Sequence, residues 1–206
     1  MKRRRKLWLL GAAVLVLALV IWAIFFRLPR PVVPASERLE SGETGSRTLI
    51  VVYSHSGNTR RVAEALQKQT GGDLLQINTR RDYLNNMAIM AMQTRAERMT
   101  GVLPALDVEL PNITQYDRIL IGGPVWSGTL ATPLSKFLSE MDLTRKTVAP
   151  FWTDAGSPGT YEEDFRTQAS GAEILNGLGL SGSSCLSDDE LNQRLAQWLT
   201  DISIIP

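Results

Sequence analysis

The chain has 206 residues, of which 44% are apolar, and this is enough for one domain of ordinary size with a buried core. Residues 1–40 hold 8 basic and 2 acidic residues, whereas residues 41–206 hold 14 basic and 19 acidic residues, a net charge of −5. This acidic balance argues against a nucleic-acid-binding surface. The single cysteine, Cys185, and the single histidine, His55, exclude an internal disulfide and a metal site built from these residue types.

The N-terminal region combines a basic cluster with a long apolar run. Five basic residues, Lys2 to Lys6, precede twenty residues, Leu7 to Phe26, that contain no charge and no proline. At about 1.5 Å per residue, a helix of this length spans about 30 Å of hydrocarbon. Residues 1–27 therefore predict a basic N-terminus and one transmembrane helix. A cleaved signal peptide is the alternative, but the run is too long and lacks a small-x-small cleavage site.

The same residues predict an orientation in the membrane. More basic residues precede the apolar run than follow it, which favours a cytoplasmic N-terminus and a domain on the periplasmic side of a bacterial inner membrane. Residues 28–46 contain three prolines and two glycines without a sustained period, and we interpret them as a linker. Residues 47–206 then form the folded domain.

From Thr48 onward, short apolar runs alternate with helical patterns. The predicted strands are 48–53, 73–78, 118–123, 147–153 and 173–178, and the predicted helices are 60–70, 132–141, 160–169 and 188–202. Such alternation predicts right-handed βαβ units and a parallel sheet covered on both faces.

Three helix starts carry capping signals. Thr132 is the expected N-cap of one helix, with Pro133 at the first helical position. Capping boxes are expected from Thr160 to Glu163 and from Ser187 to Glu190.

A turn rich in hydroxyl groups follows the first predicted strand. In a strand–turn–helix unit, the side chains of Ser54, Ser56 and Thr59 and free backbone N–H groups surround one point at the positive end of the helix dipole. Gly57 allows the backbone to approach a ligand closely. Because the chain has neither a G-x-x-x-x-G-K-[ST] nor a G-x-G-x-x-G pattern, we expect a phosphate bound without a cationic side chain.

Two later loops offer further candidate residues. The strand 118–123 leads into residues 124–128, where the indole of Trp126 can cover one face of a flat, electron-poor ring. The alternative is that Trp126 is simply a large core residue. The strand 147–153 ends in the small-residue loop 153–156. Both loops follow strands that end at the same edge as the hydroxyl-rich turn.

These segments resemble flavodoxins. The turn reads Ser54-x-Ser56-Gly57-x-Thr59, as in the flavodoxin pattern [ST]-x-[ST]-G-x-T. Residues 116–128 resemble the family segment Y-D-x-[IV]-x-[IL]-G-x-P-[IV]-W-x-G, and residues 147–157 resemble its third flavin-contacting loop. The resemblance covers roughly residues 47–202. It departs at Ser127, where many relatives have a second aromatic residue, and at Asp154, where Ser or Gly is common.

The resemblance implies an α/β, doubly wound, five-stranded parallel sheet of order 2-1-3-4-5 that binds FMN at the carboxyl ends of its strands, the known position of FMN in flavodoxin. It implies a phosphate held by the first loop, a flavin ring enclosed by the second, and a polar ring edge met by the third. The cofactor-binding residues implied are Ser54, His55, Ser56, Gly57, Asn58, Thr59, Pro124, Val125, Trp126, Ser127, Gly128, Thr153, Asp154, Ala155 and Gly156. For His55, a solvated loop side chain is an equally good interpretation.

A methionine-rich stretch lies at residues 82–100. Its methionines could line a pocket over the flavin, because thioethers adapt to varied shapes. Ordinary helix packing is the interpretation that we favour for them.

The sequence thus predicts a membrane-anchored electron-transfer flavoprotein whose partner is a redox protein or a small quinone-like acceptor. No acid–base pair or nucleophile stands out among its residues. Two alternatives stay open: an NAD(P)H-dependent quinone or nitro-compound reductase that uses FMN, and a membrane-tethered binding module without redox activity.

Overall fold

The computed structural model describes residues 14–16, 30–43 and 47–205. Apart from residues 14–16, the expected transmembrane run 7–26 lies outside these ranges. Within them, no helix has the length and hydrophobicity that a bilayer crossing requires.

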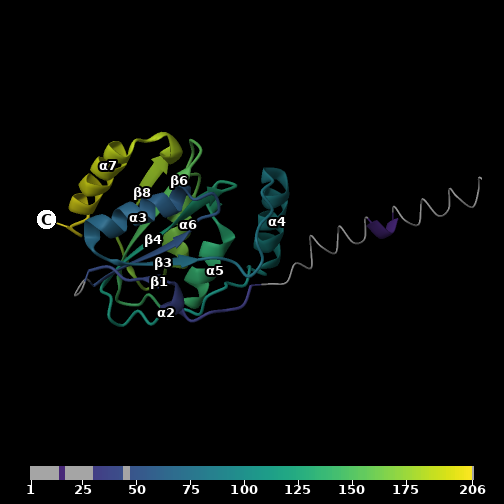
Figure 1. Cartoon of the computed structure of the whole chain (residues 1–206), viewed down its shortest axis with the longest axis horizontal. Helices are drawn as coiled ribbons and strands as arrows, with labels where there is room; N and C mark the ends of the chain where they lie inside the picture. The colour runs from purple at the N-terminus through teal and green to yellow at the C-terminus, as the bar shows by residue number, and fades with distance from the viewer. Residues whose placement is uncertain (1–13, 17–29, 44–46, 206) are drawn as a thin grey trace, which may run out of the picture.

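A mostly parallel sheet forms the centre of the molecule (Figure 1). Strand β2 (Thr48–Tyr53) is flanked by β3 (Asp73–Ile77) and β4 (Arg118–Trp126), and β4 is followed by β6 (Thr147–Asp154). All three pairings are parallel. Every residue of β2 is buried, as expected for a central strand covered on both faces. The predicted order of these strands is confirmed.

The fifth parallel strand is split into two short pieces, β7 (Glu173–Ile174) and β8 (Leu178–Ser181), which both pair with β6. The prediction of one continuous strand over 173–178 was therefore wrong. Gly177 and Gly179 lie so close to the ring of Trp152 that a Cβ atom at either position would meet it at 2.6–2.7 Å. The Trp152 ring on β6 occupies the space that the side chains of a regular neighbouring strand would need.

Part of the expected linker 28–46 joins the sheet, which corrects its interpretation as only a tether. Helix α2 (Ala35–Arg38) leads into β1 (Leu39–Glu40), which pairs antiparallel with β3. Arg38 donates a hydrogen bond of 3.0 Å to the fully buried carboxylate of Asp107. A second addition to the predicted sheet is β5 (Thr129–Leu130), which forms a hairpin with β4.

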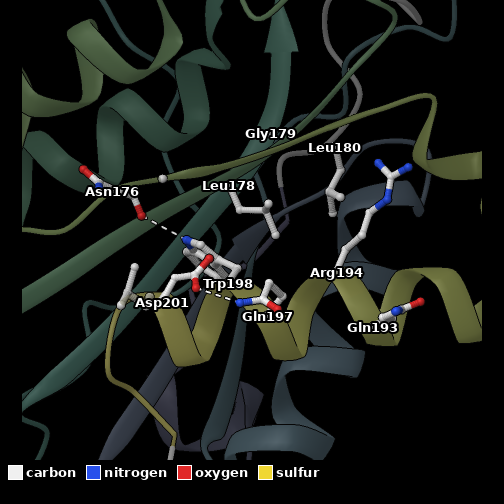
Figure 2. A pocket seen from close by; sticks show the side chains of 11 residues that line it. Asn176, Leu178, Gly179, Leu180, Gln193, Arg194, Gln197, Trp198 and Asp201 are labelled. Carbon is white, nitrogen blue, oxygen red and sulfur yellow. Dashed lines mark hydrogen bonds between the residues drawn. The ribbon is translucent and has the colours of Figure 1, made fainter.

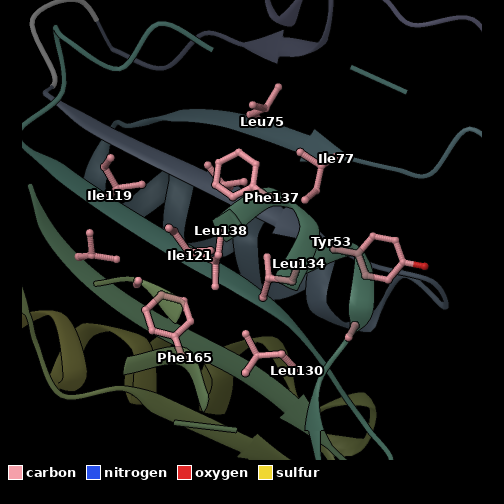
Figure 3. Packing of buried hydrophobic residues seen from close by; sticks show 14 of the residues in the cluster. Tyr53, Leu75, Ile77, Ile119, Ile121, Leu130, Leu134, Phe137, Leu138 and Phe165 are labelled. Carbon is pink, nitrogen blue, oxygen red and sulfur yellow. The ribbon is translucent and has the colours of Figure 1, made fainter. Parts of the chain in front are cut away.

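Helices cover both faces of the sheet. α3 (Asn58–Thr70) and α7 (Asp188–Asp201) pack on one face, and α5 (Thr132–Glu140) and α6 (Tyr161–Gln168) pack on the other. Figure 3 shows the second core, where Phe137 of α5 and Phe165 of α6 lie among strand residues such as Ile121. The side chains of alternate β2 residues pack into the two cores. Helix α4 (Met87–Thr100) stands at the side of the molecule (Figure 1).

Only one of the three predicted caps is confirmed. Ser187 and Glu190 form the expected reciprocal capping box of α7. The box expected from Thr160 is absent, because the Thr160 hydroxyl donates to Asp164, 2.5 Å away, instead. Ala131, not Thr132, is the N-cap of α5, since the Thr132 hydroxyl donates to Glu97 at 2.6 Å. In both cases the hydroxyl group donates its hydrogen bond to a nearby carboxylate and not to the backbone of the helix start.

Candidate functional site

A cleft of about 970 Å³ opens at the carboxyl ends of β2, β4 and β6. All three loops predicted from the sequence contribute to its walls. The contributing residues from these loops are Ser56, Asn58, Pro124, Val125, Trp126, Ser127, Thr153, Asp154, Ala155 and Gly156. The site lies where doubly wound sheets bind their ligands.

The turn after β2 leaves the start of α3 open to a ligand. Gly57 is the N-cap residue of α3, and its φ of +92° is a left-handed conformation that glycine adopts without strain. Its N–H donates to the Ser54 hydroxyl at 3.2 Å, which fixes the shape of the turn. Because glycine has no side chain that could cap the helix, the first-turn N–H groups of α3 can donate to an anion.

Thr59 and Thr153 connect two of the loops. Their hydroxyl oxygens are 2.8 Å apart, and both side chains are buried. The Thr59 hydroxyl was expected to face the turn with Ser54 and Ser56. At the start of α3, it instead contacts the Thr153 hydroxyl at the end of β6. This contact holds the first and third loops at a fixed distance.

Trp126 is the last residue of β4 and lies in the core, which corrects its expected position in a loop. Its side chain is 7% exposed. The rings of Tyr53, Tyr83 and His55 meet it edge-on, with centroids 5.3, 4.8 and 6.0 Å away. Trp126 also borders the cleft. The structure thus favours core packing for most of this ring.

Ser127 and Gly128 form the turn between β4 and β5. Both have positive φ angles, +52° and +80°, and the pairing of Trp126 with Thr129 encloses only these two residues. Two-residue hairpins favour this backbone, and glycine supplies it without strain. Hairpin geometry therefore accounts for Gly128, which does not line the cleft.

Asp154 organises the third loop and the segment after β8. Its carboxylate accepts hydrogen bonds from the Gly156 N–H at 2.7 Å and from the Ser181 hydroxyl at 2.6 Å. Its carbonyl accepts from the N–H of Gly182 at 3.0 Å. A serine or glycine at position 154 could not reach both partners in this way. This bonding gives a structural reason for the departure noted at this position.

The sequence interpretation missed one wall of the cleft, residues 181–184. This segment leads into the short helix η1 (Ser183–Cys185) and is held by Arg61, which donates to the carbonyl oxygens of Ser183 and Leu186 at 3.0 and 2.9 Å. Arg61 also pairs with Asp188 at 2.6 Å. The run of hydroxyl residues after the last strand was the available signal, since it resembles the turn after β2 in composition.

Helix α4 forms the remaining wall through Met87, Met90, Ala91 and Thr94. Met90 also packs against the core, whereas Met87 is 82% exposed. The interpretation of these methionines as ordinary helix packing was therefore incomplete. They line the cleft, as the alternative interpretation required.

Polar contacts attach α4 to the domain. The Glu97 carboxylate accepts hydrogen bonds from the hydroxyls of Tyr83 at 2.9 Å and Thr132 at 2.6 Å. Burial raises the pKa of Tyr83 above its usual range, so this hydroxyl stays protonated as a donor. Arg98 donates to the carbonyl oxygens of Trp126 and Leu130 at 2.9 and 3.0 Å.

We expect Glu97→Ala to release α4 from the cleft wall. The variant loses two hydrogen bonds to a charged group, each worth about 1.5–3 kcal/mol, so the free energy of unfolding should fall by about 3–6 kcal/mol. Urea denaturation measures this loss, and faster proteolysis within residues 87–100 would locate it. Glu163→Ala on the exposed side of α6 is the matched control and should leave both quantities unchanged. Equal stability of the two variants would contradict the role of Glu97.

Several predicted residues lie outside the cleft. Ser54 and His55 line a separate polar hollow of about 300 Å³ together with Tyr53, Asp82 and Arg30. Gly57, Thr59 and Gly128 shape the loops without lining the cleft. His55 is exposed, in agreement with the interpretation of a solvated side chain.

A groove of about 590 Å³ runs between β8 and α7 (Figure 2). Trp198 lies in it and donates from Nε1 to the carbonyl oxygen of Asn176 at 2.9 Å. None of the three predicted loops lines this groove. The cleft at the strand ends is therefore the better candidate site.

The sequence and the structure were compared with known proteins. The family model described as flavodoxin matches residues 47–202. The chain belongs to the flavodoxin family. No match is found among curated proteins.

Solved structures of flavoproteins resemble this chain over most of its length. A candidate flavoprotein from Bacteroides uniformis is 26% identical, covers 76% of this chain and 99% of its own, and gives a TM-score of 0.66. A candidate flavoprotein from Bacteroides eggerthii is 26% identical over 77% of this chain and 99% of its own, with a TM-score of 0.67. A flavoprotein from Lactobacillus acidophilus, solved in complex with FMN, is 30% identical over 66% of this chain and 93% of its own, with a TM-score of 0.58.

Proposed function

We propose that this flavodoxin-family chain is a membrane-anchored FMN protein that transfers electrons. One observation carries the proposal: the open N-terminus of α3 and the loops after β4 and β6 line a single cleft at the carboxyl ends of the strands. Family membership and the FMN complex of the Lactobacillus relative support FMN as the cofactor.

The residues of the cleft suit the parts of FMN. The phosphate would accept hydrogen bonds from the first-turn N–H groups of α3 and from Ser56 and Asn58, which reach the cleft. The backbone of residues 153–156 would meet the polar edge of the ring system. The bound flavin supplies the redox chemistry, whereas the protein binds it, orients it and tunes its surroundings.

An absorption spectrum of the purified chain tests the cofactor. We expect a bound yellow chromophore that is released as FMN on denaturation, because the phosphate site discriminates FMN from riboflavin. A properly folded chain that remains colourless with added FMN would instead favour the third interpretation, a tethered binding module without redox activity.

The second candidate function is an NAD(P)H-dependent quinone or nitro-compound reductase. The open cleft beside Met87 and Met90 favours it, because adaptable thioether side chains accept flat substrates of varied shape. Oxidation of NAD(P)H by the FMN-loaded chain in the presence of a quinone would indicate a reductase. A carrier would require a separate reductase to be reduced.

The membrane orientation is also proposed from charge. The excess of basic residues before the run 7–26 supports a cytoplasmic N-terminus and a periplasmic domain. A reporter that is active only outside the cytoplasm, fused after Pro206, should therefore be active. The control is a cytoplasm-active reporter fused at the same residue. Activity of that control with silence of the first reporter would place the domain in the cytoplasm.

A further inference from the structure

Helix α4 carries large apolar side chains on its outward face. Met92 and Met99 are 74% and 76% exposed, and the i, i+4, i+7 spacing places Ala96 on the same outward face. The opposite face carries Glu97 and Arg98, whose polar groups bond to the rest of the domain. A helix between a domain and water normally has its apolar residues inward. The outward face of α4 therefore suits an apolar environment.

This face belongs to a larger apolar patch, which we call the α4 patch. Its exposed members are Ile89, Met92, Met99 and Val102. Single exposed apolar side chains are common, but a contiguous group of large ones indicates a contact surface. Methionine suits contact with a fluid partner, because its unbranched side chain adapts to changing shapes.

Residue 30, where the described chain resumes after residue 16, is held close to α4. The N–H of Arg30 donates to the carbonyl oxygen of Arg80 at 2.6 Å, and the Arg30 guanidinium pairs with Asp82 at 2.8 Å. Arg80 in turn lines a hollow of about 370 Å³ together with Gln93 and Glu97 of α4.

The expected membrane anchor ends close to this point. Phe26, the last residue of the apolar run, precedes Arg30 by four residues, which span at most about 14 Å when fully extended. A bilayer entered by residues 7–26 therefore lies within about 14 Å of Arg30. With so short a connection, the side of the domain that carries α4 would lie close to the bilayer surface.

The charges around the α4 patch match a lipid surface. Arg95 is exposed on α4, Arg80 and Arg81 line a hollow beside this helix, and Arg30 pairs with Asp82. The first turn of α4 contains no acidic residue. Basic side chains around an apolar helix face are typical of helices that lie in the interface of an anionic bilayer.

We propose that the α4 patch lies in the headgroup region of the bilayer that holds the N-terminal anchor. This inference rests on the membrane anchoring in the proposed function, and it adds the orientation of the domain. Met87 and Met90 line the cleft from the opposite side of the same helix, so α4 would then lie between the cleft and the lipid surface.

Fluorescence quenching by lipids in the full chain tests the proposal. In a Cys185→Ser background, Met92→Cys or Met99→Cys carries an environment-sensitive dye, and Gln193→Cys on the exposed side of α7 is the matched control. The chains are reconstituted into vesicles of phosphatidylcholine and phosphatidylglycerol that contain nitroxide-labelled lipid. We expect quenching at positions 92 and 99 to be at least about twofold stronger than at 193, since an interfacial helix contacts the acyl boundary.

The outcomes separate the orientation from the anchor. Equal quenching at positions 92 and 193, in chains that stay in the vesicles after an alkaline wash, would overturn the orientation and leave the anchor intact. Loss of the chains from washed vesicles would overturn both. Disulfide formation between two Met92→Cys chains in place of lipid quenching would assign the α4 patch to a second copy and also overturn the proposal.

Discussion

Replacement of Trp126 by alanine should lower the free energy of unfolding by about 3–5 kcal/mol, the usual cost of removing a large buried aromatic side chain. The indole packs edge-on against Tyr53 and Tyr83, and edge-on pairs contribute beyond their buried area. Urea denaturation of the chain without FMN measures the loss. We expect most of it to be present in the absence of the cofactor, because the contacts that are lost lie within the protein.

Trp126→Phe is the control for this prediction. It keeps an aromatic ring in the same space and should lose much less stability than the alanine variant. If Trp126→Ala leaves the stability of the cofactor-free chain unchanged but alters FMN affinity and flavin potentials, the ring belongs to the flavin site, as first predicted from its position in the segment 124–128.

The sequence predicted the parallel sheet because its strands are continuous apolar runs. Leu49 to Val52 have no polar residue to place outward, so both faces of this strand had to be covered. The short strand β1 was missed because two residues carry no period. Its position depends on long-range contacts, such as that between Arg38 and Asp107, which are 69 residues apart. A local sequence pattern cannot predict such contacts.

The candidate site was predictable where it depends on backbone geometry. Gly57 and the hydroxyls around it marked the start of α3, since the preference for glycine is local. The walls formed by residues 181–184 and by α4 were harder to predict from the sequence. Their positions depend on tertiary contacts such as those of Arg61 and Glu97, and periodicity cannot show which side of α4 faces the cleft.

The second prediction concerns FMN affinity after substitutions around the phosphate site. Ser54→Ala and Thr59→Val should each weaken FMN binding by about 0.5–1.5 kcal/mol, because each removes a neutral hydrogen bond that positions the phosphate site. Ser54 holds the turn through the Gly57 N–H, and Thr59 fixes the start of α3 against β6. Riboflavin has no phosphate, so its weaker binding should change little in both variants. Isothermal titration of the same preparations with the two flavins measures the difference.

Thr153→Val is the matched control, because it breaks the same buried hydrogen bond as Thr59→Val from the other side. Both variants lose the 2.8 Å contact, so both should lose similar stability in urea. Only the Thr59 variant also alters the first turn of α3, where the phosphate is expected to bind. A similar loss of affinity for FMN and riboflavin in Thr59→Val would mean that this end of α3 does not hold the phosphate. A selective loss of FMN in Thr153→Val as well would assign the effect to the lost contact between Thr59 and Thr153 and not to the Thr59 side chain alone.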